Sequence, residues 1–548
     1  MSPHVRKPRA LLASLTLGGL LLSPLGCGDN PDPGDAGSEE ELGASSQSAY
    51  AIATRKWPTL TLPVCWETSG HATEKGWVKA AVENTWSAAS GISFSGWGSC
   101  TSSSTGIRIQ VADVNPHAKG IGTDINGLLN GMVLNFTFNA WSPSCQGMRQ
   151  DCIEDIAVHE FGHAVGFDHE QNRTDTPSTC NAHPTGGYGD WKMSAWDLQS
   201  VMNYCNPEWN GDGFLSTLDK QAVGELYGLL ANSDGSAGNM NGWTITQNGG
   251  NGWLAADGEF RTSYEWSKRT QTIDLYSRGF TAADLAAAPP IEISEEFRRT
   301  GCPDTYFLKV ELLDANMNVV DSFDTGEVQQ SGPCDDNGTW EKVSHVFSGY
   351  GKKPGTVRYV RWEDGGVDSE WWWGHYGAAL RNAVLKVRKN RLVNGDASNN
   401  NLNGWTVTQN GGNGWLVAGG EFRTSYDWDE RTQTIDLYSA GYSQAALASA
   451  PPIFVSEQFK RFNCPDTYAL KVEVLDTNMN VLAVYDTGDV SQTGPCDNNG
   501  AWEKVSHTFT GYGSAPRYVR WTDGGVDSEW WWGHYGVVMD DAVVAVLR

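Results

Sequence analysis

The chain has 548 residues, a length that predicts three or four domains. Its formal net charge of −26 argues against nucleic acids and anionic lipid surfaces as partners. Charged residues make up only 19% of the chain, while glycine and tryptophan are abundant. This composition is typical of secreted, β-rich modules rather than of a cytosolic enzyme.

The N-terminus has the pattern of an export signal. Basic residues precede an apolar run at residues 10–22, which is too short to span a membrane. The sequence Leu25-Gly26-Cys27 then resembles a bacterial lipobox, which implies a signal peptide at residues 1–27 and a lipid on Cys27. Simple secretion with cleavage near Gly26 is the alternative. Residues 28–49 are acidic and rich in Gly, Pro and Ser, which predicts a disordered tether.

We therefore expect an exported protein. It is either a lipoprotein of the outer membrane or cell surface, or an extracellular protein. Contact with a membrane is expected only through the lipid anchor, because no other segment of the chain has the length and hydrophobicity of a span.

The first folded region is predicted at residues 50–230 and mixes strands with helices. Strands are expected at residues 60–66, 106–111 and 131–138, the last with the pattern of an edge strand. An amphipathic helix is expected at residues 74–89, and a closing helix at residues 217–230.

A complete H-E-x-x-H-x-x-G-x-x-H motif occupies residues 159–169. On a helix, His159 and His163 lie one turn apart on the same face, so their imidazoles can bind one ion. Gly166 allows the chain to turn back and bring His169 to the same ion. Three neutral imidazoles leave the fourth position for water, as one catalytic Zn²⁺ requires, and Glu160 is placed to act on that water.

The motif and its surroundings resemble the metzincin zinc proteases, and among them the astacins. Glu170, Arg173 and Asp175 match the astacin continuation, while Thr176 and Pro177 depart from it. The resemblance implies an α+β protease fold, a Met-turn at Met202 in the sequence Ser-Val-Met-Asn-Tyr, and an edge strand that binds the substrate backbone. It also implies that Tyr204 stabilises the oxyanion and that Glu160 is the general base. Residues 215–228 resemble the closing helix of matrixins.

Cysteine usage indicates an oxidising compartment. Apart from Cys27, ten of the eleven cysteines remain, enough for five disulfides. One pair falls in each C-terminal repeat, Cys302–Cys334 and Cys464–Cys496. Six cysteines in the first domain permit fifteen pairings. Proximity in the sequence favours Cys65–Cys100, Cys145–Cys152 and Cys180–Cys205.

A long internal repeat follows a linker at residues 231–238. Residues 241–388 recur as residues 403–548, and the 14 residues from Asp364 to Gly377 recur unchanged from Asp523 to Gly536. Units of this size are domains rather than solenoid repeats. Short strands alternate with turn residues in each copy, which predicts two antiparallel sandwiches, at residues 239–389 and 401–548. A short polar linker joins them.

Tryptophans are concentrated in the two repeats. Trp243, Trp253, Trp340 and Trp362 are expected in the core of the first copy. Three consecutive tryptophans cannot all face the core of a strand, because neighbours point to opposite faces. At least one of Trp371, Trp372 and Trp373, and one of Trp530, Trp531 and Trp532, is therefore expected on the surface. Exposed aromatic rings beside acids and amides suit sugar rings.

The repeats also resemble the F-box-associated (FBA) domain. The matching segments include residues 249–253, 272–275, 340–345 and 358–362. The resemblance implies a galactose-binding-like jelly-roll sandwich, and some members bind the core of N-linked glycans through the aromatic segment formed here by the two tryptophan triplets. The third Trp of each triplet is usually Lys in those members. The alternative is that the repeats bind protein or act as spacers.

Together these features predict a multidomain chain: an α+β metzincin protease domain followed by two all-β galactose-binding-like sandwiches. The predicted function is a secreted or lipid-anchored zinc endopeptidase that acts on protein or glycoprotein substrates, with modules that bind N-glycans or other carbohydrates. The alternative is a cell-surface adhesin or lectin-like binding protein whose protease is inactive or secondary.

Overall fold

The computed structural model describes residues 50–180, 182, 189–193, 196–334, 337–496, 499–513 and 515–548. The predicted signal peptide, Cys27 and the tether lie outside these residues. Within the described residues, no helix combines the length and the hydrophobicity needed to cross a membrane.

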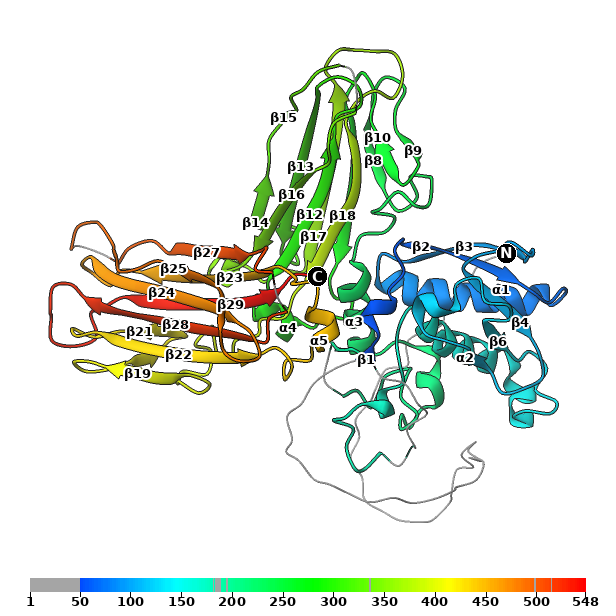
Figure 1. Ribbon diagram of the computed structural model, residues 1–548, viewed down its shortest axis with the longest axis horizontal. Coiled ribbons are helices and arrows are strands. Elements are labelled where there is room, and N and C mark those ends of the chain that lie inside the picture. The colour runs from blue at the N-terminus through cyan, green and yellow to red at the C-terminus, as the bar shows by residue number, and fades with distance from the viewer. Residues whose placement is uncertain are drawn as a thin grey trace. The chain divides into compact units, whose positions relative to one another are not determined.

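The N-terminal domain contains a five-stranded mixed sheet of order β3-β2-β4-β6-β5 (Figure 1). Its strands are β2 (Thr61–Trp66), β3 (Ser93–Ser99), β4 (Ile107–Val111), β5 (His117–Ala118) and β6 (Met132–Leu134). β2 pairs in parallel with β3 and β4, β4 pairs in parallel with β6, and β5 is antiparallel to β6. A separate two-stranded pair joins β1 (Tyr50–Ala51) to β7 (Trp191–Lys192).

The expected edge strand at residues 131–138 is wrong in length and in place. Only Met132–Leu134 form a strand, and β5 covers its outer side, so β5 is the edge of the sheet. β5 is two residues long, and so short a segment leaves no periodicity in the sequence.

The described part of this domain also contains three α-helices: α1 (Ala72–Val82), α2 (Arg149–Ala164) and α3 (Thr217–Tyr227). α1 continues into a π-helical turn at Glu83–Ser87, so the predicted helix is present but changes its winding. α3 starts with a capping box in which Ser216 accepts from the backbone of Asp219, and it stops before Gly228, whose φ is 80°. The closing helix is therefore shorter than residues 217–230.

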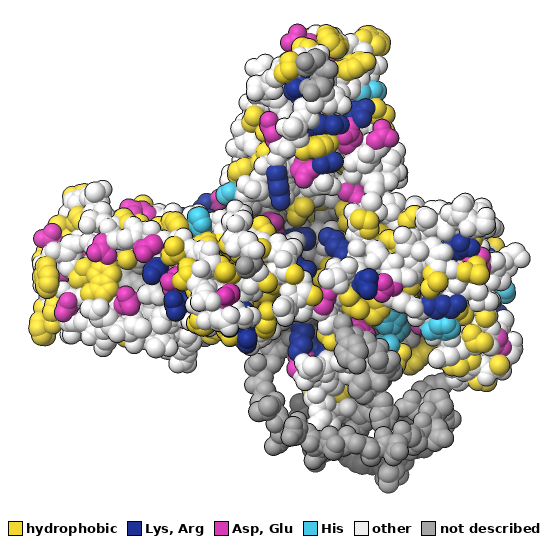
Figure 2. Space-filling model, in the orientation of Figure 1, with side chains coloured by type: hydrophobic (Ala, Val, Ile, Leu, Met, Phe, Trp, Pro, Cys, Tyr) yellow, Lys and Arg dark blue, Asp and Glu magenta, His cyan; other side chains and the backbone are white. Residues whose placement is uncertain are grey.

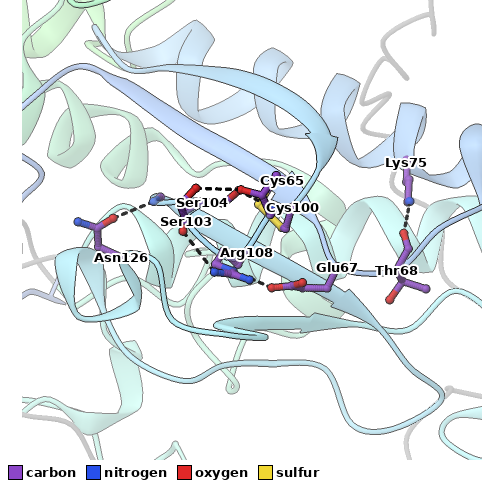
Figure 3. Close-up of a disulfide and its surroundings, with 11 residues drawn as sticks. Cys65, Glu67, Thr68, Lys75, Cys100, Ser103, Ser104, Arg108 and Asn126 are labelled. Atoms are coloured by element: carbon purple, nitrogen blue, oxygen red, sulfur yellow. Dashed lines mark hydrogen bonds and ion pairs between the residues drawn. A yellow bond between two sulfur atoms is a disulfide. The ribbon is translucent and has the colours of Figure 1, made fainter.

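Disulfides join the cysteines as Cys65–Cys100, Cys145–Cys152, Cys180–Cys205, Cys302–Cys334 and Cys464–Cys496. These are the pairings that proximity favours. Figure 3 shows the first of them, which ties β2 to the end of β3 beside the half-buried ion pair of Arg108 Nε with Glu67 Oε1 at 2.6 Å.

The first repeat is an all-β sandwich of two antiparallel sheets (Figure 1). One sheet has the order β16-β12-β18-β10-β9, with strands Glu341–Phe347, Ile291–Arg298, Ala379–Val387, Glu259–Arg261 and Leu254–Ala256. The other has the order β14-β13-β17-β11-β8, with strands Val319–Asp324, Asp304–Leu313, Tyr359–Asp368, Ser267–Asp274 and Thr244–Asn248; β15 (Val328–Gln329) pairs with β13. A short helix, α4 (Ala282–Ala286), lies between β11 and β12.

The second repeat reproduces this topology strand for strand. Its sheets have the orders β20-β21-β29-β23-β27 and β19-β22-β28-β24-β25, with β26 on β24. The strands are β19 (Thr406–Asn410), β20 (Leu416–Ala418), β21 (Glu421–Arg423), β22 (Asp429–Asp436), β23 (Ile453–Lys460), β24 (Asp466–Leu475), β25 (Val481–Asp486), β26 (Val490–Ser491), β27 (Glu503–Phe509), β28 (Tyr518–Asp527) and β29 (Val538–Val546). A short helix, α5 (Gln444–Leu447), follows β22.

Alternating inward-facing residues build the sandwich cores. In β17, Val360 and Trp362 are fully buried while their neighbours are half-exposed, as a strand with one face on the core requires. Trp243 is also buried, as expected, but Trp253 and Trp340 are only half-buried. Both of these rings lie against arginine guanidinium groups, of Arg269 and Arg381 respectively.

Candidate metal centre and aromatic sites

Helix α2 brings the first two histidines together. Residues 155–164 are all buried, so this part of the helix runs through the core and presents its polar side chains to an enclosed site. The rings of His159 and His163 lie on one side of it with centroids 5.0 Å apart. α2 ends at Ala164, and Gly166, with a φ of 107°, turns the chain so that His169 faces the helix.

The three imidazoles converge through their Nε2 atoms. His169 Nε2 lies 3.2 Å from His159 Nε2 and 3.1 Å from His163 Nε2. The Nδ1 atoms of His159 and His163 lie 2.8 Å from the carbonyl oxygens of Val201 and Phe167, to which they can only donate. Neutral rings in this tautomer point their Nε2 lone pairs at one another, an arrangement that a cation between them resolves.

This donor set fits zinc. Nitrogen ligands at the usual zinc distance lie about 3.3 Å apart in a tetrahedral site, close to the separations seen here. Within the described part of the chain these histidines are the one group of at least three His, Cys, Asp or Glu side chains close enough to hold a metal ion. Burial lowers the pKa of His159 to about 4 and that of His163 to about 3, so both rings are neutral near pH 7.

Glu160 lies beside the histidines, and one of its carboxylate oxygens has no hydrogen-bond partner among the described residues. Its side chain is 6% exposed, and this oxygen, Oε2, is buried. The backbone of Ala118 in β5 donates a hydrogen bond to the carboxylate, so the edge strand also positions this group. Burial raises the pKa of Glu160 to about 8, and a nearby cation would lower it again.

Met202 packs beneath the site and is not positioned as a ligand. Its side chain is 1% exposed, and its Sδ lies only 2.3 Å from where a Cβ on Gly162 would be. Gly162 is therefore required for the close approach of the Met-turn to α2. A glycine inside a predicted helix was the available signal for this residue.

Asp219 in α3 holds the turn that contains Met202 through hydrogen bonds. Asp219 accepts hydrogen bonds from Ser200 Oγ at 2.7 Å and from the Val201 backbone N–H at 2.9 Å. The Val201 carbonyl in turn accepts a hydrogen bond from His159 Nδ1, so Asp219 orients a candidate metal ligand through the backbone of one residue, Val201. No short motif marks Asp219, because its partners lie about twenty residues earlier in the chain.

Tyr204 lies over the histidines. Its ring centroid is 4.5 Å from that of His169 and 5.6 Å from that of His159, and its side chain is half-exposed. The disulfide Cys180–Cys205 anchors the next residue. The structure thus brings together His159, His163, His169, Glu160, Met202 and Tyr204, all named from the sequence.

Glu170 is buried and pairs inside the domain. Arg173 Nη1 lies 3.2 Å from Glu170 Oε2, and the same guanidinium donates to both oxygens of Asp175. The astacin-like residues after the third histidine therefore form one buried ionic cluster.

The tryptophan triplets occupy the loop between the last two strands of each sandwich. The exposed fractions of Trp371, Trp372 and Trp373 are 68%, 46% and 78%, so the expectation of at least one exposed ring is confirmed, and all three are exposed. Asp368, at the end of β17, accepts the backbone N–H groups of Glu370 and Trp372 at 2.8 and 2.6 Å, which folds the loop outward. Hydrophobic side chains are visible at the ends of both sandwiches in Figure 2.

Two tyrosines order these rings. Tyr264 stacks on Trp373 with centroids 5.3 Å apart, and Tyr376 lies edge-on to Trp372 at 5.8 Å. Tyr264 was missed by sequence reasoning, although the repeated Arg-Thr-Ser-Tyr at residues 261–264 and 423–426 was the available signal.

The second copy has the same arrangement. Trp530, Trp531 and Trp532 are 69%, 44% and 78% exposed. Tyr426 stacks on Trp532 at 5.1 Å, and Asp527 accepts the N–H of Trp531 at 2.7 Å. Trp371 and Trp530 both adopt a positive φ, 62° and 60°, which is uncommon for a bulky residue. The two loops have the same sequence from Asp364 to Gly377 and from Asp523 to Gly536, so they share this backbone conformation.

Comparison with known proteins identifies the repeats. The model of the F-box associated region matches residues 227–387 and 385–546, which is more than half of the chain. F-box only protein 2 of Bos taurus is 31% identical over 180 residues, covering 30% of this chain and 60% of the relative. F-box only protein 27 of Macaca fascicularis is 35% identical over 162 residues, covering 27% and 55%. The chain thus spans less than two thirds of the length of these relatives.

Solved structures of carbohydrate-binding modules are also similar. The tandem CBM22-1–CBM22-2 domain of Paenibacillus barcinonensis Xyn10C is 13% identical, covers 58% of this chain and 97% of its own, and has a TM-score of 0.20. TmCBM61 in complex with β-1,4-galactotriose is 14% identical, covers 29% and 99%, and has a TM-score of 0.19. From the match of both repeats to the family model, the chain belongs to the F-box associated region family, with two copies of the domain in tandem.

Proposed function

We propose that the chain binds glycans or glycoproteins through its two FBA domains and hydrolyses peptide bonds with a zinc-dependent endopeptidase domain at residues 50–230. The observation that carries the enzymatic half is the convergence of three imidazoles, with His169 Nε2 at 3.2 Å and 3.1 Å from the Nε2 atoms of His159 and His163. Beside them lies a buried carboxylate, one oxygen of which has no hydrogen-bond partner among the described residues. The binding half rests on the family match and on the duplicated, exposed aromatic loops.

A second candidate function is a cell-surface binding protein in which the protease is inactive or secondary. The family match covers residues 227–546 and so supports the binding half alone. The distinction between the two candidates therefore depends on the chemistry of the histidine cluster.

In the proposed enzyme, His159, His163 and His169 hold the zinc. When bound, zinc supplies a Lewis acid for the scissile carbonyl and lowers the pKa of its water. Glu160 accepts a proton from the attacking water and later delivers it to the leaving amine. Tyr204, whose ring lies beside His169, donates its phenolic hydrogen to the developing oxyanion. The carbonyls of Val201 and Phe167 hold two ligands in the required tautomer.

Metal analysis tests the enzymatic half. We expect about one zinc per purified chain, because three neutral imidazoles in this geometry complete a catalytic-type donor set. Removal of the metal with a chelator is expected to stop casein digestion, and added zinc to restore it. A folded chain that takes up no zinc, or a zinc-bound chain without hydrolysis, would favour the second candidate.

Replacement of the most exposed tryptophans tests the binding half. We expect Trp373→Ala with Trp532→Ala to weaken binding to an N-glycosylated protein about tenfold or more, because a stacked ring contributes on the order of 1 kcal/mol at each of two linked sites. Surface plasmon resonance would compare the glycoprotein with its deglycosylated form. Trp209→Ala removes an exposed indole from the N-terminal domain and is the matched control. Equal affinity for both forms of the target would exclude glycan recognition.

A further inference from the structure

A cavity of about 940 Å³ lies where the outer strands of both FBA domains approach the start and the end of the described chain. β16 contributes Lys342 and β27 contributes Lys504, which are the same position in the two repeats. Lys56, Lys386 and Arg548 complete the charged wall. We call this space the basic cavity.

The charge of the cavity is opposite to that of the chain. Five basic side chains line it against one carboxylate, Glu292, in a protein with a net charge of −26. Glu292 already accepts a hydrogen bond from Arg388 Nε at 2.6 Å. Asp321, whose charge acts on Lys504, is paired with Lys353. Among the described residues, none of the four lysines of the wall forms an ion pair with Asp or Glu.

Lys386 shows how strongly this environment disfavours a positive charge. Its side chain is 5% exposed, and its Nζ donates to a backbone oxygen of Arg548 at 2.6 Å. Burial, and next the charges of Arg388 and Lys56, hold its pKa well below the usual range. Nη1 of Arg548 is also buried without a partner among the described residues. If the backbone oxygen of Arg548 belongs to a carboxylate, the basic groups of the wall still outnumber the acidic groups.

Basic groups that share one cavity repel one another. A buried one such as Lys386 is normally matched by an anion when it is charged, because an unpaired buried charge costs several kcal/mol. The second component of the wall is hydroxyl groups, from Ser344, Ser449, Ser506, Thr508 and Thr510. Cations together with many hydroxyls suit a ligand that presents both acidic groups and alcohols. The volume lies within the range of small-molecule sites, about 300–1,000 Å³.

We propose that the basic cavity binds an anionic oligosaccharide, a short glycan that bears sulfate, phosphate or carboxylate groups. The site lies on β16 and β27, whereas the tryptophan triplets lie in the loops that follow β17 and β28. It is therefore a binding site separate from the aromatic sites and from the histidine cluster, and it adds a preference for acidic glycans to the proposed function.

Calorimetric titration of the full chain tests this site with defined probes. Sucrose octasulfate supplies sulfate, inositol hexakisphosphate supplies phosphate and an oligogalacturonate supplies carboxylate, while sucrose is the neutral control. We expect saturable binding of at least one of the anions, weakened by added salt, and no binding of sucrose. The preferred anion identifies the acidic group.

Substitution locates the binding. Lys342 and Lys504 are both exposed, so Lys342→Ala with Lys504→Ala removes two charges with little risk to folding. We expect this variant to bind about tenfold more weakly or worse. The charge-matched control is Lys79→Ala with Lys471→Ala, an exposed and a half-exposed lysine outside the cavity, and it should change affinity by less than about twofold.

Three outcomes would overturn the proposal: no saturable binding of any of the three anions, an equal loss in the cavity variant and its control, or a loss of anion binding in the Trp373→Ala, Trp532→Ala variant. Unchanged anion binding in the Trp373→Ala, Trp532→Ala variant is expected if the two kinds of site are separate. Loss of anion binding in that variant would place the anions at the tryptophans instead.

Discussion

Replacing Glu160 with Gln is expected to lower casein hydrolysis by about 10²- to 10⁴-fold while the zinc content stays at one ion per chain. The amide keeps the size and the buried position of the side chain but cannot accept the proton of the attacking water. The histidines are untouched, and their carbonyl partners at Val201 and Phe167 are unchanged. Metal analysis and turnover of a quenched peptide would be measured on the same preparation.

A control for that substitution is available on the same helix. Glu154 lies about one and a half turns before Glu160 and is half-exposed, so Glu154→Gln makes the same chemical change away from the histidines. We expect near-normal turnover in this variant. Normal turnover of a zinc-replete Glu160→Gln protein would remove Glu160 from the mechanism.

Removal of Arg269 is expected to destabilise the first FBA domain by about 3–5 kcal/mol. This side chain is fully buried and donates to Asp364 at 2.7 Å and to Glu295 at 3.1 Å. Its guanidinium also lies 3.7 Å from the ring centre of Trp243. Arg269→Ala leaves two buried carboxylates without their cation and opens a cavity beside the indole.

Calorimetry of the full chain would measure this effect domain by domain. For a domain of this size the expected cost lowers one unfolding transition by about 10 °C. Arg431→Ala should produce the same shift in the second domain, because Arg431 donates to Asp523 and Glu457 in the same way. Arg361→Ala is the control, since its pair with Glu311 is partly exposed and is expected to contribute less than about 1 kcal/mol. A shift of only a degree or two for Arg269→Ala would show that the buried cluster is not needed for stability.

The candidate metal centre was predictable because its main residues are close in the sequence. His159 and His163 are separated by one helical turn, and Gly166 alone reverses the chain to His169, so local geometry is sufficient. Asp219 and Ala118 were not predictable, because they reach the site from a distant helix and a two-residue strand. The prediction of the edge strand was wrong for the same reason, because β5 is defined by its pairing with β6 and not by a sequence pattern of its own.

The sequence by itself determined the domain order, the two copies of the sandwich and the histidine triad. Each of these is written in short spacings or in direct repetition. Only the tertiary structure decided which strand forms the edge beside Glu160, how Tyr264 supports Trp373, and that lysines from both repeats enclose one cavity. The physical reason is that these features depend on contacts between residues tens to hundreds of positions apart, and those contacts follow from packing of whole elements rather than from local backbone preference.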